Sequence, residues 1–207
     1  LPKGATPEDF TQQLAALLRS DPDVVMLARL ADAKTAQLVA QHAEDIRVYA
    51  QIPGDDGFDA VKRWVKAVGN RKQAAHALRM VLSQRLIRRL CTTCRRAYTP
   101  DPAALRKLNL PAGKIGQLYQ ASGKVVIKDR EQPCPACLGL GYRGRVAVFE
   151  VLDFDDQARD LLAKGELDAV RTYLRKRKTL YLQEAGLAKA VEGVTDIKEI
   201  TRVMSGK

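Results

Sequence analysis

The chain carries its four cysteines in two short stretches, Cys91-Thr92-Thr93-Cys94 and Cys134-Pro135-Ala136-Cys137, which constrain its fold more strongly than any other segment. A Cys-x-x-Cys turn directs two sulfurs at one point. Two such turns complete the tetrahedral sulfur set that Zn²⁺ prefers in structural sites, with Zn–S distances of about 2.3 Å. The sequence therefore predicts a structural zinc site whose ligands are Cys91, Cys94, Cys134 and Cys137.

The distance between the two pairs leaves alternatives to a compact zinc ribbon open. The pairs are separated by 39 residues, whereas about 15–20 are usual in a ribbon, so an extended insertion must fold back to bring them together. A redox-active Cys-x-x-Cys and unliganded cysteines are the two alternatives to a metal. Thiols stay reduced in a cytoplasmic setting, which favours a metal over disulfides.

Helices and strands alternate in the residues that precede the first cysteine pair. The pattern predicts a helix that begins at Thr6-Pro7 and ends before Asp21, further helices over 33–42, 58–68 and 73–84, and strands over 24–30 and 46–52. The near-continuous apolar run of the first strand is typical of a parallel strand that is buried on both faces. This alternation predicts an α/β layer architecture with a parallel sheet.

The pattern changes at the first cysteine pair and again near residue 153. A strand over 143–152 closes the cysteine-bearing region, and helices are predicted over 154–163, 167–177, 180–191 and 196–204. We therefore expect three domains: 1–90, an α/β portion; 91–152, a tetracysteine insertion with its closing strand; and 153–207, an all-helical subdomain.

The composition excludes several classes of protein. With 46% hydrophobic and 29% charged residues in 207, the chain is neither disordered, nor collagen-like, nor a disulfide-dense mini-protein. No apolar run approaches the roughly 18–20 residues that cross a bilayer, and no signal peptide is visible. We expect a soluble cytoplasmic protein without a transmembrane segment.

A net charge of +11 favours anionic partners. The cations gather in two clusters: Arg85, Arg88, Arg89, Arg95 and Arg96, and Arg171, Arg175, Lys176, Arg177 and Lys178. Such runs are more often solvated faces than binding sites. Because aromatic residues are only 5% of the chain and do not alternate with these cations, nucleic-acid binding is expected to be weak and non-specific.

The sequence shows no Walker A phosphate loop. Gly113-Lys114 and Gly123-Lys124 lack the upstream glycine and the Ser or Thr that should follow the lysine. Residues 139–144 match G-x-G-x-x-G, but they follow a Cys-x-x-Cys turn rather than a strand, so we reject a dinucleotide fingerprint. We therefore expect neither nucleotide-binding nor catalytic residues in this chain.

A set of segments carries a family pattern: Leu18–Met26, Thr35–Gln37, Gln84–Cys94, Cys134–Cys137, and Gly141–Arg145 with Glu150. In order and spacing they resemble the C-terminal part of the secretion ATPases that drive type II secretion and type IV pilus assembly. The resemblance implies a partial RecA-like sheet, a zinc-bearing insertion, a helical C-terminal domain and a homo- or hetero-hexameric ring peripheral to the inner membrane. It also implies secretion or pilus assembly proteins as partners at the cytoplasmic membrane face. ATP with Mg²⁺ is implied only if a phosphate loop lies upstream of Leu1.

The chain departs from that family at three positions where phosphoryl transfer needs polar groups. Where the family usually reads Val-Gly-Glu-Ile-Arg-Asp, its Walker B box, this chain has residues 27–32. The water-orienting glutamate is thus replaced by Arg29, which cannot accept a proton, and the family's arginine by Ala31. Farther along, Pro53 replaces the family's histidine and offers no side-chain hydrogen bond.

Three functional hypotheses follow from these observations. The one we favour is a catalytically silent scaffold or regulatory subunit of a secretion or pilus machine, with zinc as a structural cofactor. The second is a fragment of an active secretion ATPase whose phosphate loop lies upstream of Leu1 and whose catalytic residues have moved to other positions. Arg29 would then act in trans as an arginine finger. The third is a zinc-ribbon nucleic-acid-binding protein.

Overall fold

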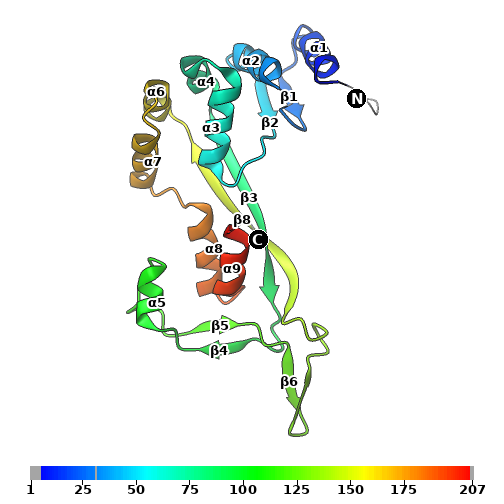
Figure 1. The fold of residues 1–207 in the computed structure, drawn as a ribbon, viewed down its shortest axis with the longest axis vertical. Coiled ribbons are helices and arrows are strands. Elements are labelled where there is room, and N and C mark those ends of the chain that lie inside the picture. Colours follow the sequence, from blue (N-terminus) through cyan, green and yellow to red (C-terminus); the bar gives the residue numbers. More distant parts are fainter. Residues whose placement is uncertain (1–5, 31, 206–207) are drawn as a thin grey trace. The chain divides into compact units, whose positions relative to one another are not determined.

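The computed structural model describes residues 6–30 and 32–205, which form two compact units. Each unit is built from two segments of the chain. Unit 1 comprises Leu1–Ser83 with Val151–Thr179, and unit 2 comprises Gln84–Glu150 with Leu180–Lys207. The long strands β3 (Met80–Leu90) and β8 (Tyr142–Asp153) pair with each other, and each contributes residues to both units (Figure 1).

Unit 1 contains a parallel pair of strands and six helices among its described residues. Its elements are α1 (Pro7–Leu18), β1 (Val24–Leu27), α2 (Ala33–His42), β2 (Arg47–Ala50), α3 (Gly57–Val68), α4 (Arg71–Ala77), α6 (Asp156–Lys164) and α7 (Leu167–Lys176). β1 and β2 run parallel, with Val24 opposite Arg47 and Leu27 opposite Ala50. The predicted alternation of helices with parallel strands is confirmed.

The core of unit 1 lies between the strand pair and its helices. Val25 and Leu27 of β1 are buried in one cluster with Leu14 of α1 and Trp64 of α3. The Trp64 indole N–H is also satisfied, because it donates to the carbonyl of Ala74 at 2.8 Å. This hydrogen bond allows the largest aromatic side chain of the unit to be buried without leaving its N–H group unpaired.

The prediction of a strand over residues 24–30 buried on both faces is wrong in two respects. β1 ends at Leu27, and its alternate residues Val24 and Met26 are 53% and 84% exposed. The described helices pack against only one face of the strand, so burial follows the alternation of side chains that any strand shows. A run of consecutive apolar residues does not reveal this difference.

The predicted helix over residues 73–84 is wrong in its second half. α4 ends at Ala77, Leu78 already has an extended backbone, and β3 begins at Met80. Leu, Met, Gln and Arg favour helices by propensity, but here the stretch pairs with β8, a segment distant in sequence. Long-range strand pairing therefore overrides local propensity in this segment.

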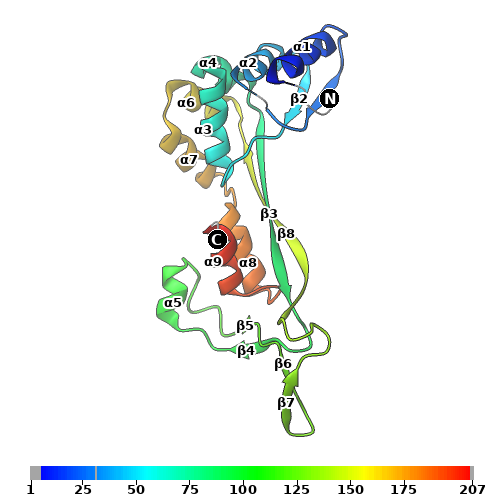
Figure 2. The same ribbon diagram turned by 45° about the vertical axis from the view of Figure 1, so that its right-hand side comes forward.

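Unit 2 combines two small antiparallel strand pairs with three helices among its described residues. Its remaining elements are β4 (Arg96–Tyr98), α5 (Pro102–Lys107), β5 (Leu118–Gln120), β6 (Lys124–Ile127), β7 (Arg130–Pro133), α8 (Leu182–Val191) and α9 (Ile197–Met204). β4 pairs with β5 and β6 with β7 (Figure 2). All four helices expected after residue 153 are present.

The helices α8 and α9 pack directly against each other in unit 2. Leu187 and Ile200 are buried in one cluster with Ile87 of β3 and Val148 of β8. A Cβ atom at residue 186 would lie 2.9 Å from Ile200 Cδ1, so Gly186 permits this close approach. Within residues 6–30 and 32–205, no helix combines the length and apolar character needed to cross a membrane.

Candidate metal centre

The four cysteine sulfurs meet at one buried point in unit 2. All four Sγ atoms lie within 4.8 Å of one another, with 3.9 Å between those of Cys91 and Cys134 and 3.7 Å between those of Cys94 and Cys137. A tetrahedron with Zn–S distances of about 2.3 Å has sulfurs roughly 3.8 Å apart, whereas a disulfide joins them at about 2.05 Å. The donor set therefore fits a tetrahedral metal ion, and the predicted folding back of the insertion is confirmed.

Backbone hydrogen bonds shape the first cysteine turn and join it to the second. The Cys91 carbonyl accepts from the N–H groups of Cys94 at 3.3 Å and Arg95 at 2.9 Å. Gly141 links the turns, because its N–H donates to Cys137 Sγ at 3.2 Å and its carbonyl accepts from the Cys91 N–H at 2.9 Å. Such contacts orient the sulfurs before any metal binds.

The second cysteine turn rests against the base of the β6–β7 hairpin. The Cys134 carbonyl accepts from the Gly139 N–H at 3.1 Å, and the Cys134 N–H donates to the Gly123 carbonyl at 2.8 Å. Gly123 has a φ of +74°, and a Cβ there would lie 2.2 Å from the Gly139 oxygen. Only glycine fits at residue 123, so this position sets how closely the hairpin approaches the cysteine cluster.

The surroundings of Cys91 and Cys94 shift the pKa values of their thiols in opposite directions. Burial raises the pKa of the Cys91 thiol, but backbone hydrogen bonds from Thr93 and Cys94 outweigh it and lower the pKa to about 7. Burial and the neighbouring Cys137 thiol raise the pKa of Cys94 to about 12. A metal must therefore displace protons to gain four thiolates, and its binding will weaken in acid.

Two residues that depart from the family pattern, Arg29 and Pro53, lie at one edge of the strand pair. Arg29 follows β1 and Pro53 follows β2, and both are exposed. A hydrogen bond of 2.9 Å from the Leu30 N–H to the Gln51 carbonyl joins the two segments. Because the strands are parallel, this is the carboxyl edge at which open α/β sheets bind ligands. Ala31 lies outside the described residues.

Sequence reasoning missed a buried carboxylate in unit 2. The Glu199 side chain is fully buried, and its Oε2 accepts from Arg88 Nη2 at 2.6 Å while its Oε1 accepts from Arg202 Nη2 at 2.7 Å. Burial raises the pKa of Glu199, but the hydrogen bonds from Arg202 and Arg88 outweigh it and lower the pKa to about 2. The carboxylate is therefore charged and fully paired.

A second polar pair lies beside this carboxylate. The Tyr142 hydroxyl donates to Asp196 Oδ2 at 2.8 Å, and the Tyr142 ring lies 4.0 Å from the guanidinium carbon of Arg88. Burial and the hydrogen bond to Asp196 raise the pKa of Tyr142, so its proton stays in place. The sequence showed the basic cluster around Arg88. It gave no indication of Glu199, the acidic partner of Arg88, which lies 111 residues away along the chain.

Residues 3–202 match the family described as "Type II/IV secretion system protein". The chain belongs to this family. A type IV pilus assembly ATPase, PilB of Thermus thermophilus, is 33% identical over 195 residues that cover 92% of this chain and 21% of PilB. Type II secretion system protein E of Pseudomonas aeruginosa is 30% identical over 195 residues, covering 94% of this chain and 37% of the relative. This member of the secretion family thus spans about a fifth to two fifths of these relatives.

Solved structures of the ATPase DotB share the fold of this secretion family member. DotB of Legionella pneumophila has a TM-score of 0.60 at 16% identity, covering 96% of this chain and 42% of DotB. DotB of Yersinia pseudotuberculosis has a TM-score of 0.59 at 13% identity, with 96% and 41% covered. The mixed α/β fold and the resemblance to secretion ATPases predicted from the sequence are confirmed.

Proposed function

We propose that this segment of a type II/IV secretion system protein is a zinc-stabilised scaffold that does not itself hydrolyse ATP. The observation that carries the proposal is Arg29, exposed at the carboxyl end of β1, where the family pattern places a water-orienting glutamate. A carboxylate can accept a hydrogen bond from the attacking water, and a guanidinium has only donors. Pro53, at the adjacent strand end, adds no side-chain donor or acceptor.

We expect no ATP hydrolysis above background by the natural full-length chain that contains these residues. Loss of a positioned proton acceptor typically lowers turnover by about 10²–10⁴-fold, and Arg29 supplies none. Phosphate release should therefore stay at background in the wild type and in Arg29→Glu, because Pro53 still stands at the neighbouring position. Phosphate release under saturating ATP and Mg²⁺ is the measurement, with Lys34→Glu as a matched charge change.

One observation favours a second candidate, in which Arg29 completes the site of a neighbouring subunit as an arginine finger. Within the described part of the chain, Arg29 has neither an ion-pair nor a hydrogen-bond partner. Mixing the chain with a catalytically intact relative separates the two functions. If the mixture releases phosphate faster than the relative alone, and Arg29→Gln abolishes this gain, the arginine finger is favoured. If the chain alone releases phosphate in a manner that depends on Arg29, the silent scaffold is refuted.

We propose that Cys91, Cys94, Cys134 and Cys137 hold one structural Zn²⁺. The convergence of their sulfurs supports this assignment. Four protein ligands leave no open coordination position, so the ion would contribute folding free energy rather than Lewis-acid chemistry. Its effect would be to hold two turns, far apart in sequence, at the base of the β6–β7 hairpin.

Protein purified without added metal should contain one zinc per chain. Elemental analysis gives the metal content, and titration of thiols in the folded and denatured protein gives the number of protected cysteines. The expected result is one equivalent of zinc and no reactive thiol before denaturation. Less than about half an equivalent, with four titratable thiols in the folded protein, would refute a resident zinc ion.

We further propose that the chain works at the cytoplasmic face of the inner membrane with secretion or pilus assembly proteins. The relatives are named for type IV pilus assembly and type II secretion, and this supports the proposed setting. The parallel pair β1 and β2 would then form part of a RecA-like sheet. Assembly into a homo- or hetero-hexamer belongs to the same proposal.

A further inference from the structure

A cavity in unit 2 is lined by three arginines from three different elements. Its volume is about 370 Å³, and its lining residues are Leu86, Arg88, Arg145 and Arg202. Arg88 belongs to β3, Arg145 to β8 and Arg202 to α9. We propose that this cavity binds a phosphate-type oxyanion, which is a property separate from the zinc site and from the scaffold function proposed above.

Two of the arginines are held in place before any ligand arrives. The buried Glu199 accepts from Nε and Nη2 of Arg88, at 2.8 and 2.6 Å, and from Nε and Nη2 of Arg202, at 2.8 and 2.7 Å. A guanidinium has five N–H donors, so each arginine keeps donors that Glu199 does not use. Within residues 6–30 and 32–205 these remaining donors have no recorded acceptor, and the side chains are 42% and 47% exposed.

Arg145 supplies the third guanidinium. It is exposed and has no ion-pair or hydrogen-bond partner in the part of the chain that the structure describes. Glu199 neutralises one of the three positive charges, and Asp196 is already engaged by the Tyr142 hydroxyl and the Ala121 N–H. The surplus positive charge and the forked donors match a phosphate dianion, which arginine binds in a bidentate manner.

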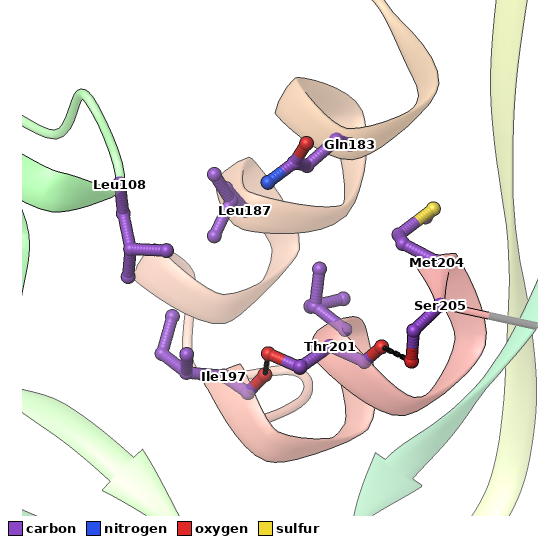
Figure 3. Close-up of a pocket in the computed structure, with 8 residues that line it drawn as sticks. Leu108, Gln183, Leu187, Ile197, Thr201, Met204 and Ser205 are labelled. Atoms are coloured by element: carbon purple, nitrogen blue, oxygen red, sulfur yellow. Dashed lines mark hydrogen bonds between the residues drawn. The ribbon is translucent and has the colours of Figure 1, made fainter. Parts of the chain in front are cut away.

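A second cavity in unit 2 differs from the arginine cavity in the charge of its lining residues. Its volume is about 240 Å³. Figure 3 shows Leu108, Leu187, Ile197 and Met204 among the residues that line it. It has no charged lining residue. The Thr201 hydroxyl there donates to a carbonyl of its own helix at 3.0 Å, and the other polar side chains of the lining, Gln183 and Ser205, are neutral, so this cavity lacks the positive charge that favours an oxyanion. The two cavities therefore differ in chemistry, and only the arginine cavity suits an anion.

Inorganic phosphate is the first probe, titrated at constant ionic strength and followed by calorimetry and by the NMR signals of the arginine side chains. We expect saturable binding with a Kd on the order of 1 mM or tighter. Arg145→Gln should weaken it at least tenfold without loss of folding, because no hydrogen bond or ion pair of Arg145 within the described residues would be lost. Arg130→Gln, an exposed arginine of β7, loses the same charge outside the cavity and should bind like the wild type.

A parallel titration with ATP identifies the source of the phosphoryl group. ATP affinity more than tenfold above that of phosphate, again lost in Arg145→Gln, assigns the site to a nucleotide, and equal or lower affinity assigns it to the free anion. The phosphate affinity of Arg202→Gln is compared with that of Arg145→Gln, after circular dichroism has confirmed that Arg202→Gln is folded. The proposal is overturned if the wild type shows no saturable binding, or if Arg145→Gln binds phosphate as tightly as Arg130→Gln.

Discussion

Replacing Cys134 with serine is expected to release the metal and to unfold the region from Cys91 to Gly141. Cys134 is fully buried, and its sulfur is one of four that share a single centre. The apparent binding free energy of a structural zinc site is on the order of 10 kcal/mol, comparable to the whole stability of a domain. Loss of one thiolate should therefore unfold both cysteine turns and the β6–β7 hairpin that adjoins the second turn.

Elemental analysis and hydrogen exchange measure this effect together. In Cys134→Ser we expect less than one tenth of an equivalent of zinc and loss of amide protection across residues 91–141. The control is Thr92→Ser, an exposed neighbour within the first cysteine turn, which should keep both metal and protection. If Cys134→Ser retained a full equivalent of zinc with unchanged protection, these cysteines would not form the metal centre.

Replacing Glu199 with glutamine should lower the free energy of unfolding by about 3 kcal/mol. Removal of one partner from a buried ion pair costs about 3–5 kcal/mol, and the lower end applies because both guanidiniums reach solvent. The neutral amide cannot accept from two guanidiniums as the carboxylate does, so Arg88 and Arg202 would lose their shared anchor. Urea unfolding curves measure the difference. Glu192→Gln, which alters an exposed pair with Lys189, should change stability by less than about 0.5 kcal/mol.

Glu199 should also make the free energy of unfolding decrease as the pH is lowered. Its pKa falls from the ordinary 4.5 to about 2 in the folded protein, so the unfolded chain takes up the proton first as the pH is lowered. The contribution of Glu199 is complete above about pH 4.5 and is lost as the pH falls towards about 2. Glu199→Gln should lack this part of the acid transition, and an unchanged acid profile would show that Glu199 is not held as a paired carboxylate.

Local signals in the sequence were sufficient where neighbouring residues alone define the structure. α2 spans Ala33–His42, as predicted, because Asp32 caps its first turn through the Thr35 N–H at 2.7 Å and buried Val39 follows at helical spacing. The cysteine pairs were equally informative, since Cys-x-x-Cys geometry and tetrahedral coordination need no knowledge of the rest of the fold.

The sequence was insufficient where the decisive partner is distant. β3 was predicted in part as a helix because its pairing with β8 has no local signal, and strand formation depends on such pairing. Glu199 was overlooked for a related reason, since carboxylates are rarely buried unless paired, and its partner Arg88 lies in another element. The arginine cavity follows from the same long-range contact, so neither site could be inferred from spacing.

The two-segment construction of each unit has a consequence for how the chain is made. A ribosome produces the N-terminal end first, and chains with several domains usually fold one domain after another as they emerge. Here residues 1–83 must wait for residues 151–179, and residues 84–150 must wait for residues 180–207. Synthesis that stops after Glu150 would leave both units without their second segment, so early termination or proteolysis there yields no intact half. The folded state of both units is therefore reached only after the last of these four segments has been made.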